Sequence, residues 1–327
     1  MAGSDKGAGE ARPFLTTGVG VLLAAALCCF LWGSAFPAIK TGYAVIGIAS
    51  DDVASQILFA GVRFLLSGVM VAVGMSVARR RPFVPAARDL PQIAVLSLFK
   101  TIGQYIFFYM GLATAAGVTS SIISGSTYLF SILFAVLVFR TERFTWRTAL
   151  GCVVGLAGVV LINLDGLFAG GTLTLGGEGC ILVSAVLGAV ANCLTKTFAA
   201  EHDSVLLSGW QFALGGAVLV VVGLAMGGSI VPVDSANLLP AVAVLLYLAL
   251  VSAVAFSLWS HLLALNPVSR VSVYGFLTPV FGTLLSAALL AESAEVDPVL
   301  AALALVLVCA GIVAVNGAPK EPQPRRG

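Results

Sequence analysis

The sequence predicts an all-α integral membrane protein with ten transmembrane helices in two inverted five-helix repeats. An apolar composition, an internal repeat and a reversal of loop charge between the two copies lead to this prediction. Hydrophobic residues make up 59% of the 327 residues, charged residues make up only 10%, and the mean hydropathy is +1.06. A soluble domain of this size would need more polar surface, so the lipid bilayer is the expected partner of most of the chain.

Ten stretches are long and apolar enough to cross a bilayer, which takes about 20 mostly apolar residues. They lie at 16–42, 53–77, 91–112, 118–139, 145–163, 178–199, 204–226, 238–263, 269–291 and 297–316. The first is too long for a signal-peptide core and lacks a cleavage site, so we expect it to be retained. The expected organisation is an N-terminal tail (1–15), a first five-helix repeat (16–163), a second, inverted repeat (178–316) and a C-terminal tail (317–327).

Four pairs of segments recur in the same order about 150 residues apart, which predicts an inverted repeat. Any two apolar, glycine-rich helices align somewhere, but four pairs in one order are specific. The pairs are SSIISGSTYLFSILFAVLVFRTERF (120–144) with RVSVYGFLTPVFGTLLSAALLAESA (270–294), GVVLIN (158–163) with GIVAVN (311–316), GVRFLLSG (61–68) with GWQFALGG (209–216), and the helix ending in Lys40 with the helix ending in Lys196.

Loop charge sets the expected orientation. With the N-terminus in the cytoplasm, all but three of the 17 lysines and arginines lie on the cytoplasmic side. The loop RTERF (140–144) is basic, whereas its repeat partner AESAEVD (291–297) is acidic. Equivalent loops therefore lie on opposite sides, as tandem copies of a five-helix unit require. Both termini are expected in the cytoplasm.

The sequence gives no sign of a cofactor, a metal site or a catalytic centre. The six cysteines lie in or beside helices without a CxxC pair, and His202 and His261 have no ligand set nearby. Neither a GxxxxGKS/T nucleotide loop nor an HExxH motif occurs, which argues against ATP-driven transport and against a metalloprotease. Topology explains the basic loops, so no nucleic-acid partner is expected.

Four segments resemble the EamA-type transporters of the drug/metabolite transporter superfamily. They are WGSAFPAIK (32–40), FAGVRFLLSG (59–68), FFYMGLATAAGVTSS (107–121) and SAVAFSLWSHLLALNPVSRVSVYGFLTPVFGTLLSAALLAE (252–292). The resemblance implies two inverted five-helix bundles, alternating access, and a central cavity lined chiefly by helices 1, 3, 4, 6, 8 and 9. Members move amino acids, nucleotide-related compounds or other small metabolites, often outward. Leu129 replaces a proline that would match Pro279, and Gly188 replaces a tryptophan like Trp32, so the two halves are expected to differ in kinks and lining.

Two cations fall near the bilayer midplane. Arg63 lies about eleven residues into the second stretch and Lys100 about ten into the third, each roughly 15 Å deep. A cation at that depth costs about 2.5 to 3.5 kcal/mol unless it is paired or hydrated, and no acid lies at comparable depth. We expect at least one of them to face the cavity and bind a substrate carboxylate or phosphate. The alternatives are a structural tie for Arg63 and a bend of Lys100 towards the inner interface, while Lys40 reaches headgroups or the cavity mouth.

Other polar and aromatic residues are candidates for the cavity wall. Gln104 and Tyr105, with Tyr109, are predicted to share one broad helix face with Lys100, and Ser124 and Tyr128 are four residues apart. Interhelical bonding, an aromatic belt or anchoring are the alternatives. Further candidates are Asn192, Trp32, Trp259, Tyr274 and Thr278, with Pro279 as a hinge. Gly151 and Gly155 have GxxxG spacing, which suits packing within the subunit or a dimer, so monomer and homodimer both stay open.

These features predict a secondary transporter (permease or exporter) of the cytoplasmic membrane that moves a small metabolite by alternating access. An amino acid or another carboxylate-bearing compound is the expected cargo. The alternative is a multidrug efflux carrier for cationic compounds. A membrane-embedded enzyme is a weaker alternative because the sequence lacks a catalytic cluster, and a channel is a weaker one because the inverted repeat disfavours it.

Overall fold

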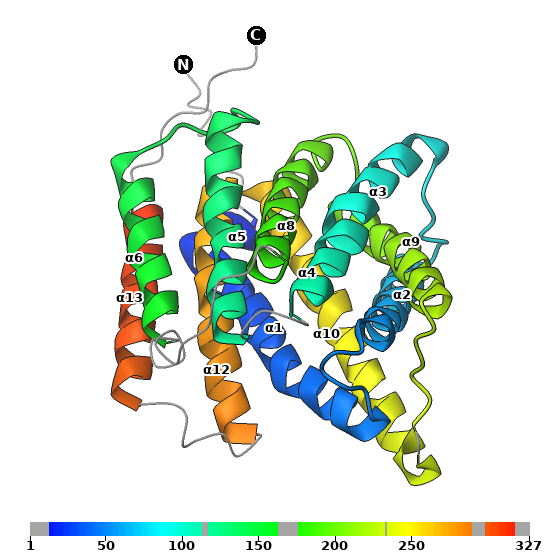
Figure 1. Cartoon of the computed structure of the whole chain (residues 1–327). Coiled ribbons are helices and arrows are strands. Elements are labelled where there is room, and N and C mark those ends of the chain that lie inside the picture. Colours follow the sequence, from blue (N-terminus) through cyan, green and yellow to red (C-terminus); the bar gives the residue numbers. More distant parts are fainter. Residues whose placement is uncertain (1–12, 113–116, 163–175, 233, 290–297, 318–327) are drawn as a thin grey trace, which may run out of the picture.

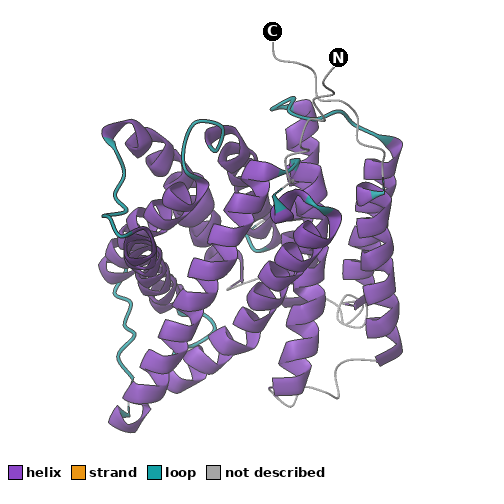
Figure 2. Cartoon of the chain, turned by 180° about the vertical axis from the view of Figure 1, so that it is seen from behind, coloured by secondary structure: helices purple, strands orange, loops and turns teal. Residues whose placement is uncertain are grey.

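The computed structural model describes residues 13–112, 117–162, 176–232, 234–289 and 298–317, and this part of the chain is helical without a strand (Figure 2). Eight helices are long and apolar enough to span a membrane. The shorter apolar helices Ile123–Leu137 and Trp146–Leu161 bring the number of apolar helices in the described part to ten. The chain is therefore an all-α, multi-pass membrane protein, as its composition predicts.

The helices of the first half are α1 (Gly18–Ile46), α2 (Val53–Arg79), α3 (Leu90–Leu96), α4 (Gln104–Leu112), α5 (Gly117–Leu137) and α6 (Trp146–Ile162). Those of the second half are α8 (Glu178–Phe198), α9 (Ser204–Ala225), α10 (Leu238–Leu265), α11 (Val268–Ser272), α12 (Leu277–Leu289) and α13 (Pro298–Asn316). Short 3₁₀ turns lie at Phe14–Thr16, Ala87–Asp89 and Ser235–Asn237.

Two predicted helices, 91–112 and 269–291, are each interrupted. A π-helical segment, Ser97–Gly103 (η3), joins α3 to α4. A 3₁₀ turn, Val273–Phe276 (η5), joins α11 to α12. Pro279 then falls in the first turn of α12, three residues after the 3₁₀ turn. Pro279, the predicted hinge, therefore follows directly on a change of helix type, and its role as a hinge stays a prediction.

Polar residues in the sequence set several helix ends. The side chain of Thr17 accepts from the N–H of Gly20 at the start of α1, and that of Asp52 accepts from the N–H of Ser55 at the start of α2. Gly47 ends α1 with φ 87°, a conformation that glycine adopts without strain. Local caps thus position the long helices whose middle turns build the core.

Helices at equivalent positions of the two halves pack against each other, α2 on α9 and α6 on α13. The α2–α9 contact is close because glycines face it: a Cβ on Gly68 would lie 2.4 Å from the backbone nitrogen of Ala213. Phe64 and Phe212, which align in the repeat, stack with centroids 5.0 Å apart and planes at 9°. The repeat in the sequence is therefore also a pairing in space.

The GxxxG face of α6 contacts α13 of the same subunit. A Cβ on Gly151 would lie 2.6 Å from the carbonyl oxygen of Gly311, and one on Gly311 would lie 2.9 Å from the nitrogen of Gly155. This close approach uses the small face predicted from the spacing. Packing within the subunit, one of the two alternatives, is thus present.

The arrangement is inverted between the halves. The first helix of each half bridges the molecule, since α1 packs on α10 and α12 while α8 packs on α4 and α5. In Figure 1, α5 ends and α6 begins at the edge near which the termini are drawn, whereas α12 ends and α13 begins at the opposite edge. The acidic segment 291–297 and most of both predicted tails lie outside the described residues.

Candidate functional site

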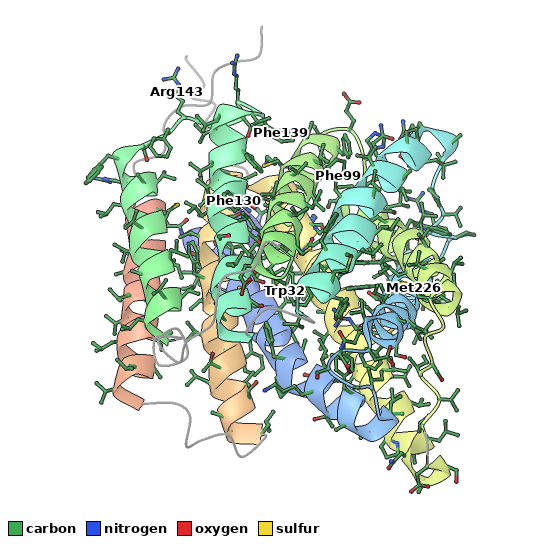
Figure 3. All side chains as sticks on the ribbon, viewed as in Figure 1. Trp32, Phe99, Phe130, Phe139, Arg143 and Met226 are labelled. Carbon is green, nitrogen blue, oxygen red and sulfur yellow. The ribbon has the colours of Figure 1, made fainter. Side chains whose placement is uncertain are left out.

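An aromatic cluster occupies the centre of the bundle, where helices of both halves meet. Phe256 of α10 lies 4.9 Å from Trp32, 4.7 Å from Phe212 and 6.5 Å from Phe64, measured between ring centroids. Trp259 extends the cluster, 5.0 Å from Trp32. Figure 3 shows Trp32 in the middle of the molecule, between the two groups of helices. The cluster gives the site an apolar, polarisable wall.

Lys100 points at this cluster from the π-helical segment. Its Nζ lies 5.6 Å from the Phe256 centroid, the residue is 4% exposed, and Nζ has no hydrogen-bond partner among the described residues. Tyr105, at the start of α4, lies 4.5 Å from the ring of Phe64, which is 6.5 Å from Phe256, measured between ring centroids. A buried ammonium and a phenol therefore both border the aromatic cluster.

Beside Lys100, a buried hydrogen-bond chain joins the π-helical segment to α9. Thr101 Oγ1 donates to Gln211 Oε1 at 2.7 Å, and Ser97 Oγ donates to the Gln211 carbonyl at 3.0 Å. Gln211 is fully buried, yet its Nε2 has no partner in the described part of the chain. In the repeat alignment Gln211 matches Arg63, so both halves place a nitrogen donor at this position.

Arg63 is the second buried cation, at 4% exposure, with its guanidinium carbon 4.5 Å from the Phe64 centroid. Its Nε and Nη1 have no hydrogen-bond partner among the described residues. Three phenols, those of Tyr43, Tyr105 and Tyr109, are close enough to interact electrostatically with the guanidinium. The arginine therefore sits among neutral hydroxyls, and none of the ion pairs recorded in the described residues includes it.

The unpartnered nitrogens at the centre are all donors. The group consists of Lys100 Nζ, Arg63 Nε and Nη1, Gln211 Nε2 and Trp32 Nε1. Buried polar groups normally find partners, and an unpaired buried charge is costlier still. Such a set is complementary to an anion such as a carboxylate, which accepts several hydrogen bonds and neutralises positive charge.

Tyr128 and Thr278, two predicted site residues, meet across the halves. Their hydroxyls are 3.3 Å apart, and the residues align with each other in the repeat. The Tyr128 ring lies directly against Gly275, where a Cβ would come within 2.1 Å of it, and 6.2 Å from Trp259. Glycine is needed there because any side chain would displace the ring. Ser124, one turn earlier, is partly exposed on the same helix.

Other predicted residues lie elsewhere. Gln104 packs on Gly188 of α8, so an interhelical contact, one of its two predicted roles, is present, and its place in the cavity wall stays a prediction. Asn192 Nδ2 donates to Ser131 Oγ at 3.1 Å, an interhelical bond. Tyr274 is buried, and its carbonyl accepts from Cys29 Sγ at 3.2 Å.

Trp259 is 1% exposed, and Lys40 is exposed near the end of α1. The predictions missed Phe256, Phe212 and Gln211. The alignment of GVRFLLSG with GWQFALGG was the signal for the last two, because it matches them with Phe64 and Arg63.

At the edge with the basic loops, a carboxylate joins the two halves. Glu142, in the α5–α6 connection, accepts from the backbone N–H groups of Val268 and Ser269 at the start of α11. Nearby, Lys196 Nζ donates to the Ala264 carbonyl at 3.0 Å. The Glu142 contact joins the two halves at the start of the short helix that leads to Thr278, whereas the Lys196 bond lies within the second half.

The sequence profile described as the EamA-like transporter family matches residues 19–164 and 175–317. A "Probable terminal-alkyne amino-acid exporter" of Streptantibioticus cattleyicolor is 28% identical over 288 residues, covering 87% of this chain and 89% of that protein. An "Uncharacterized inner membrane transporter YedA" of Escherichia coli K12 is 25% identical over 273 residues, with 80% of each chain covered. A crystal structure superposes with a TM-score of 0.70 at 20% identity, over 89% of this chain and 98% of that one, which shows a shared fold.

Proposed function

Because this chain belongs to the EamA-like transporter family, we propose that it is a secondary transporter for a small metabolite that bears a carboxylate or another anionic group, for example an amino acid. The cargo's anionic group binds between Lys100 and the neighbouring donors, and its remaining part packs on the aromatic cluster. Export is the proposed direction, supported by the name of the S. cattleyicolor relative. Alternating access moves the cargo across the cytoplasmic membrane.

The single observation that carries this proposal is the excess of unpartnered donors around Lys100 and Arg63. The described residues supply neither cation with an acidic partner. A carboxylate that enters the site forms charge-assisted hydrogen bonds and neutralises a buried charge at the same time.

The proposed orientation places both termini in the cytoplasm. Arg79, Arg143 and Arg147 lie at the edge where α6 begins and α2 ends, and the positive-inside rule assigns such an edge to the cytoplasm. Glu142 then closes the cytoplasmic side by joining the halves. In the alternating-access cycle this contact opens when cargo enters from the cytoplasm.

Efflux of lipophilic cations is the second candidate, and the aromatic cluster is the observation in its favour, since rings bind cations through their faces. Lys100 stands against it, because its ammonium already faces the Phe256 ring at 5.6 Å. A second cation at that ring would meet like-charge repulsion in a site of low dielectric constant.

Thermal unfolding of the purified protein in detergent, with a panel of amino acids, organic anions and lipophilic cations, tests the proposal. Selective binding raises the melting temperature by mass action. We expect a shift with anionic or zwitterionic compounds that is lost in Lys100→Gln and kept in Arg143→Gln, which removes an exposed positive charge at the edge. A shift with lipophilic cations alone would replace this proposal by multidrug efflux.

A further inference from the structure

A pocket of about 350 Å³ lies at the basic edge of the molecule, between the end of α2 and the start of α9. This volume is within the range of about 300–1,000 Å³ for small-molecule pockets. The pocket shares no residue with the central site. Its lining consists of Arg79, Arg81, Pro82, Phe83, Val84, Arg88, Asp89, Asp203 and Leu206.

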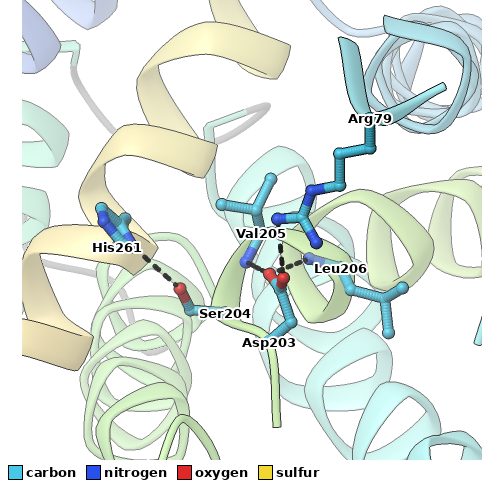
Figure 4. A network of polar contacts seen from close by, with 6 residues as sticks. All are labelled: Arg79, Asp203, Ser204, Val205, Leu206 and His261. Carbon is cyan, nitrogen blue, oxygen red and sulfur yellow. Dashed lines mark hydrogen bonds and ion pairs between the residues drawn. The ribbon is translucent and has the colours of Figure 1, made fainter. Parts of the chain in front are cut away.

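The two carboxylates of this pocket are already engaged. Asp203 accepts from Arg79 Nη2 at 2.8 Å and from the N–H groups of Val205 and Leu206 at 2.9 and 3.1 Å (Figure 4). Asp89 pairs with His202 Nδ1 at 2.6 Å and accepts from the N–H of Ala86 at 2.8 Å. Their negative charge is therefore directed at the protein rather than into the pocket.

Two of the three arginines remain available. Arg79 is held by Asp203, and its guanidinium carbon lies 4.6 Å from the Phe83 centroid. Arg88 is 78% exposed and reaches Asp89 only at 3.9 Å. Arg81 is exposed and takes part in none of the ion pairs recorded for the described residues. The pocket thus presents the unpaired guanidinium of Arg81 and that of Arg88, which is held only by a long, exposed contact; the planar geometry of both suits a phosphate.

The wall of the pocket is preformed. The N–H of Phe83 donates to Ser76 Oγ at 2.8 Å, and Trp210 Nε1 donates to the Phe83 carbonyl at 2.9 Å. The N–H of Arg81 donates to the Ser76 carbonyl at 3.1 Å. These bonds fix the segment after α2 against α9, so a ligand that binds here does not have to order the loop.

The pocket also borders the apolar surface of the molecule. Val84, in its lining, is 62% exposed, and Val77, one turn before Arg81, is 73% exposed. In a bilayer such side chains contact acyl chains, while a basic pocket at the cytoplasmic end of a helix attracts acidic headgroups. We propose that this pocket binds the phosphate of an anionic phospholipid between Arg81 and Arg88, with an acyl chain along Val77 and Val84.

The test is a titration of the purified full-length protein in detergent with phosphatidylglycerol, read by native mass spectrometry of the bound lipid. The double variant Arg81→Gln/Arg88→Gln is expected to bind about 25-fold more weakly, roughly fivefold per arginine. Arg143→Gln is the matched control, because it removes an exposed charge at the same edge but outside the pocket, and it is expected to bind like the wild type.

Three results would overturn the proposal. The first is wild-type lipid affinity in the double variant. The second is a loss of affinity in Arg143→Gln as large as that from removing one pocket arginine, which would mean that the lipid responds to the overall charge of this edge. The third is that inorganic phosphate displaces the lipid and binds with the same dependence on Arg81 and Arg88, which would make the occupant a free anion. Phosphatidylcholine, which carries no net charge, is expected to bind the wild type and the double variant equally. The readout needs no cargo, so it stands apart from the proposed function.

Discussion

Charged side chains are held in opposite ways at the basic edge and at the centre of the bundle. At the edge, Asp203 binds Arg79 and caps α9, and Glu142 accepts from the first N–H groups of α11. At the centre, Lys100 and Arg63 are each 4% exposed, and the described residues give neither an acidic partner. The edge charges therefore hold connections together through carboxylates, whereas the central charges contact aromatic rings and phenols and pair with none of the acids in the described residues.

This difference separates stability from function. A partnered charge contributes to the fold, and its removal leaves the other partner unsatisfied. A charge without an acidic partner at membrane depth lowers the stability of the fold, so its presence indicates a role in function. If this distinction holds, substitutions at the two places change stability in opposite directions.

The largest effect is expected at the centre. Lys100→Met keeps a long, flexible side chain and removes the ammonium, which should stabilise the ligand-free protein by up to about 3 kcal/mol, the insertion cost of a central lysine. The melting temperature in detergent without cargo measures it. A lower melting temperature would show that Lys100 has a structural partner.

Asp89→Ala is expected to lower the free energy of unfolding by about 2 kcal/mol, because His202 and the N–H of Ala86 both lose a buried partner. Unfolding of the purified protein compares this variant with Glu201→Ala, which removes an exposed acid from the α8–α9 connection. Equal melting temperatures for the two variants would show that the contacts of Asp89 do not stabilise the fold.

Glu142→Gln tests the contact between the halves. The neutral amide still accepts a hydrogen bond but carries no negative charge at the start of α11, so we expect the free energy of unfolding to fall by about 1 kcal/mol. Accessibility of a cysteine introduced at Ser269 to a membrane-impermeant maleimide should also rise. Unchanged labelling would show that Glu142 does not keep this side closed.

The smallest effect is expected for Arg79→Gln, because its ion pair with Asp203 is about one-third exposed on both sides. Exposed pairs contribute roughly 0.2 to 1 kcal/mol and weaken with salt. Melting curves at low and high ionic strength should converge for wild type and variant. A difference in melting temperature that persists at high salt would show that this ion pair is shielded from solvent.

Hydropathy and loop charge predicted the membrane fold and the presence of ten apolar helices, because helix length in a bilayer follows directly from the apolar stretch. They did not predict the π-helical segment at Ser97–Gly103, which packs against α8 and α9. Gln104, just after this segment, contacts Gly188 of α8, so the interhelical contact that was one of its two predicted roles is present.

The candidate site was predicted in part. The depth of Arg63 and Lys100 marked them as costly, and burial at both positions agrees with that depth. Phe256 was missed because a phenylalanine in an apolar helix carries no signal by itself. Its role depends on contacts with Trp32, Phe212 and Phe64 from three other helices, which only the tertiary structure reveals.

Transport by the reconstituted protein tests most directly whether the central cations hold the cargo. Counterflow of a labelled anionic or zwitterionic ligand into proteoliposomes would be measured for the wild type, Lys100→Gln, Arg63→Gln and the control Arg143→Gln. We predict saturable counterflow in the wild type and the control, and its loss in Lys100→Gln while the variant stays folded. Wild-type counterflow in both Lys100→Gln and Arg63→Gln would contradict a cargo-binding role for the central cations.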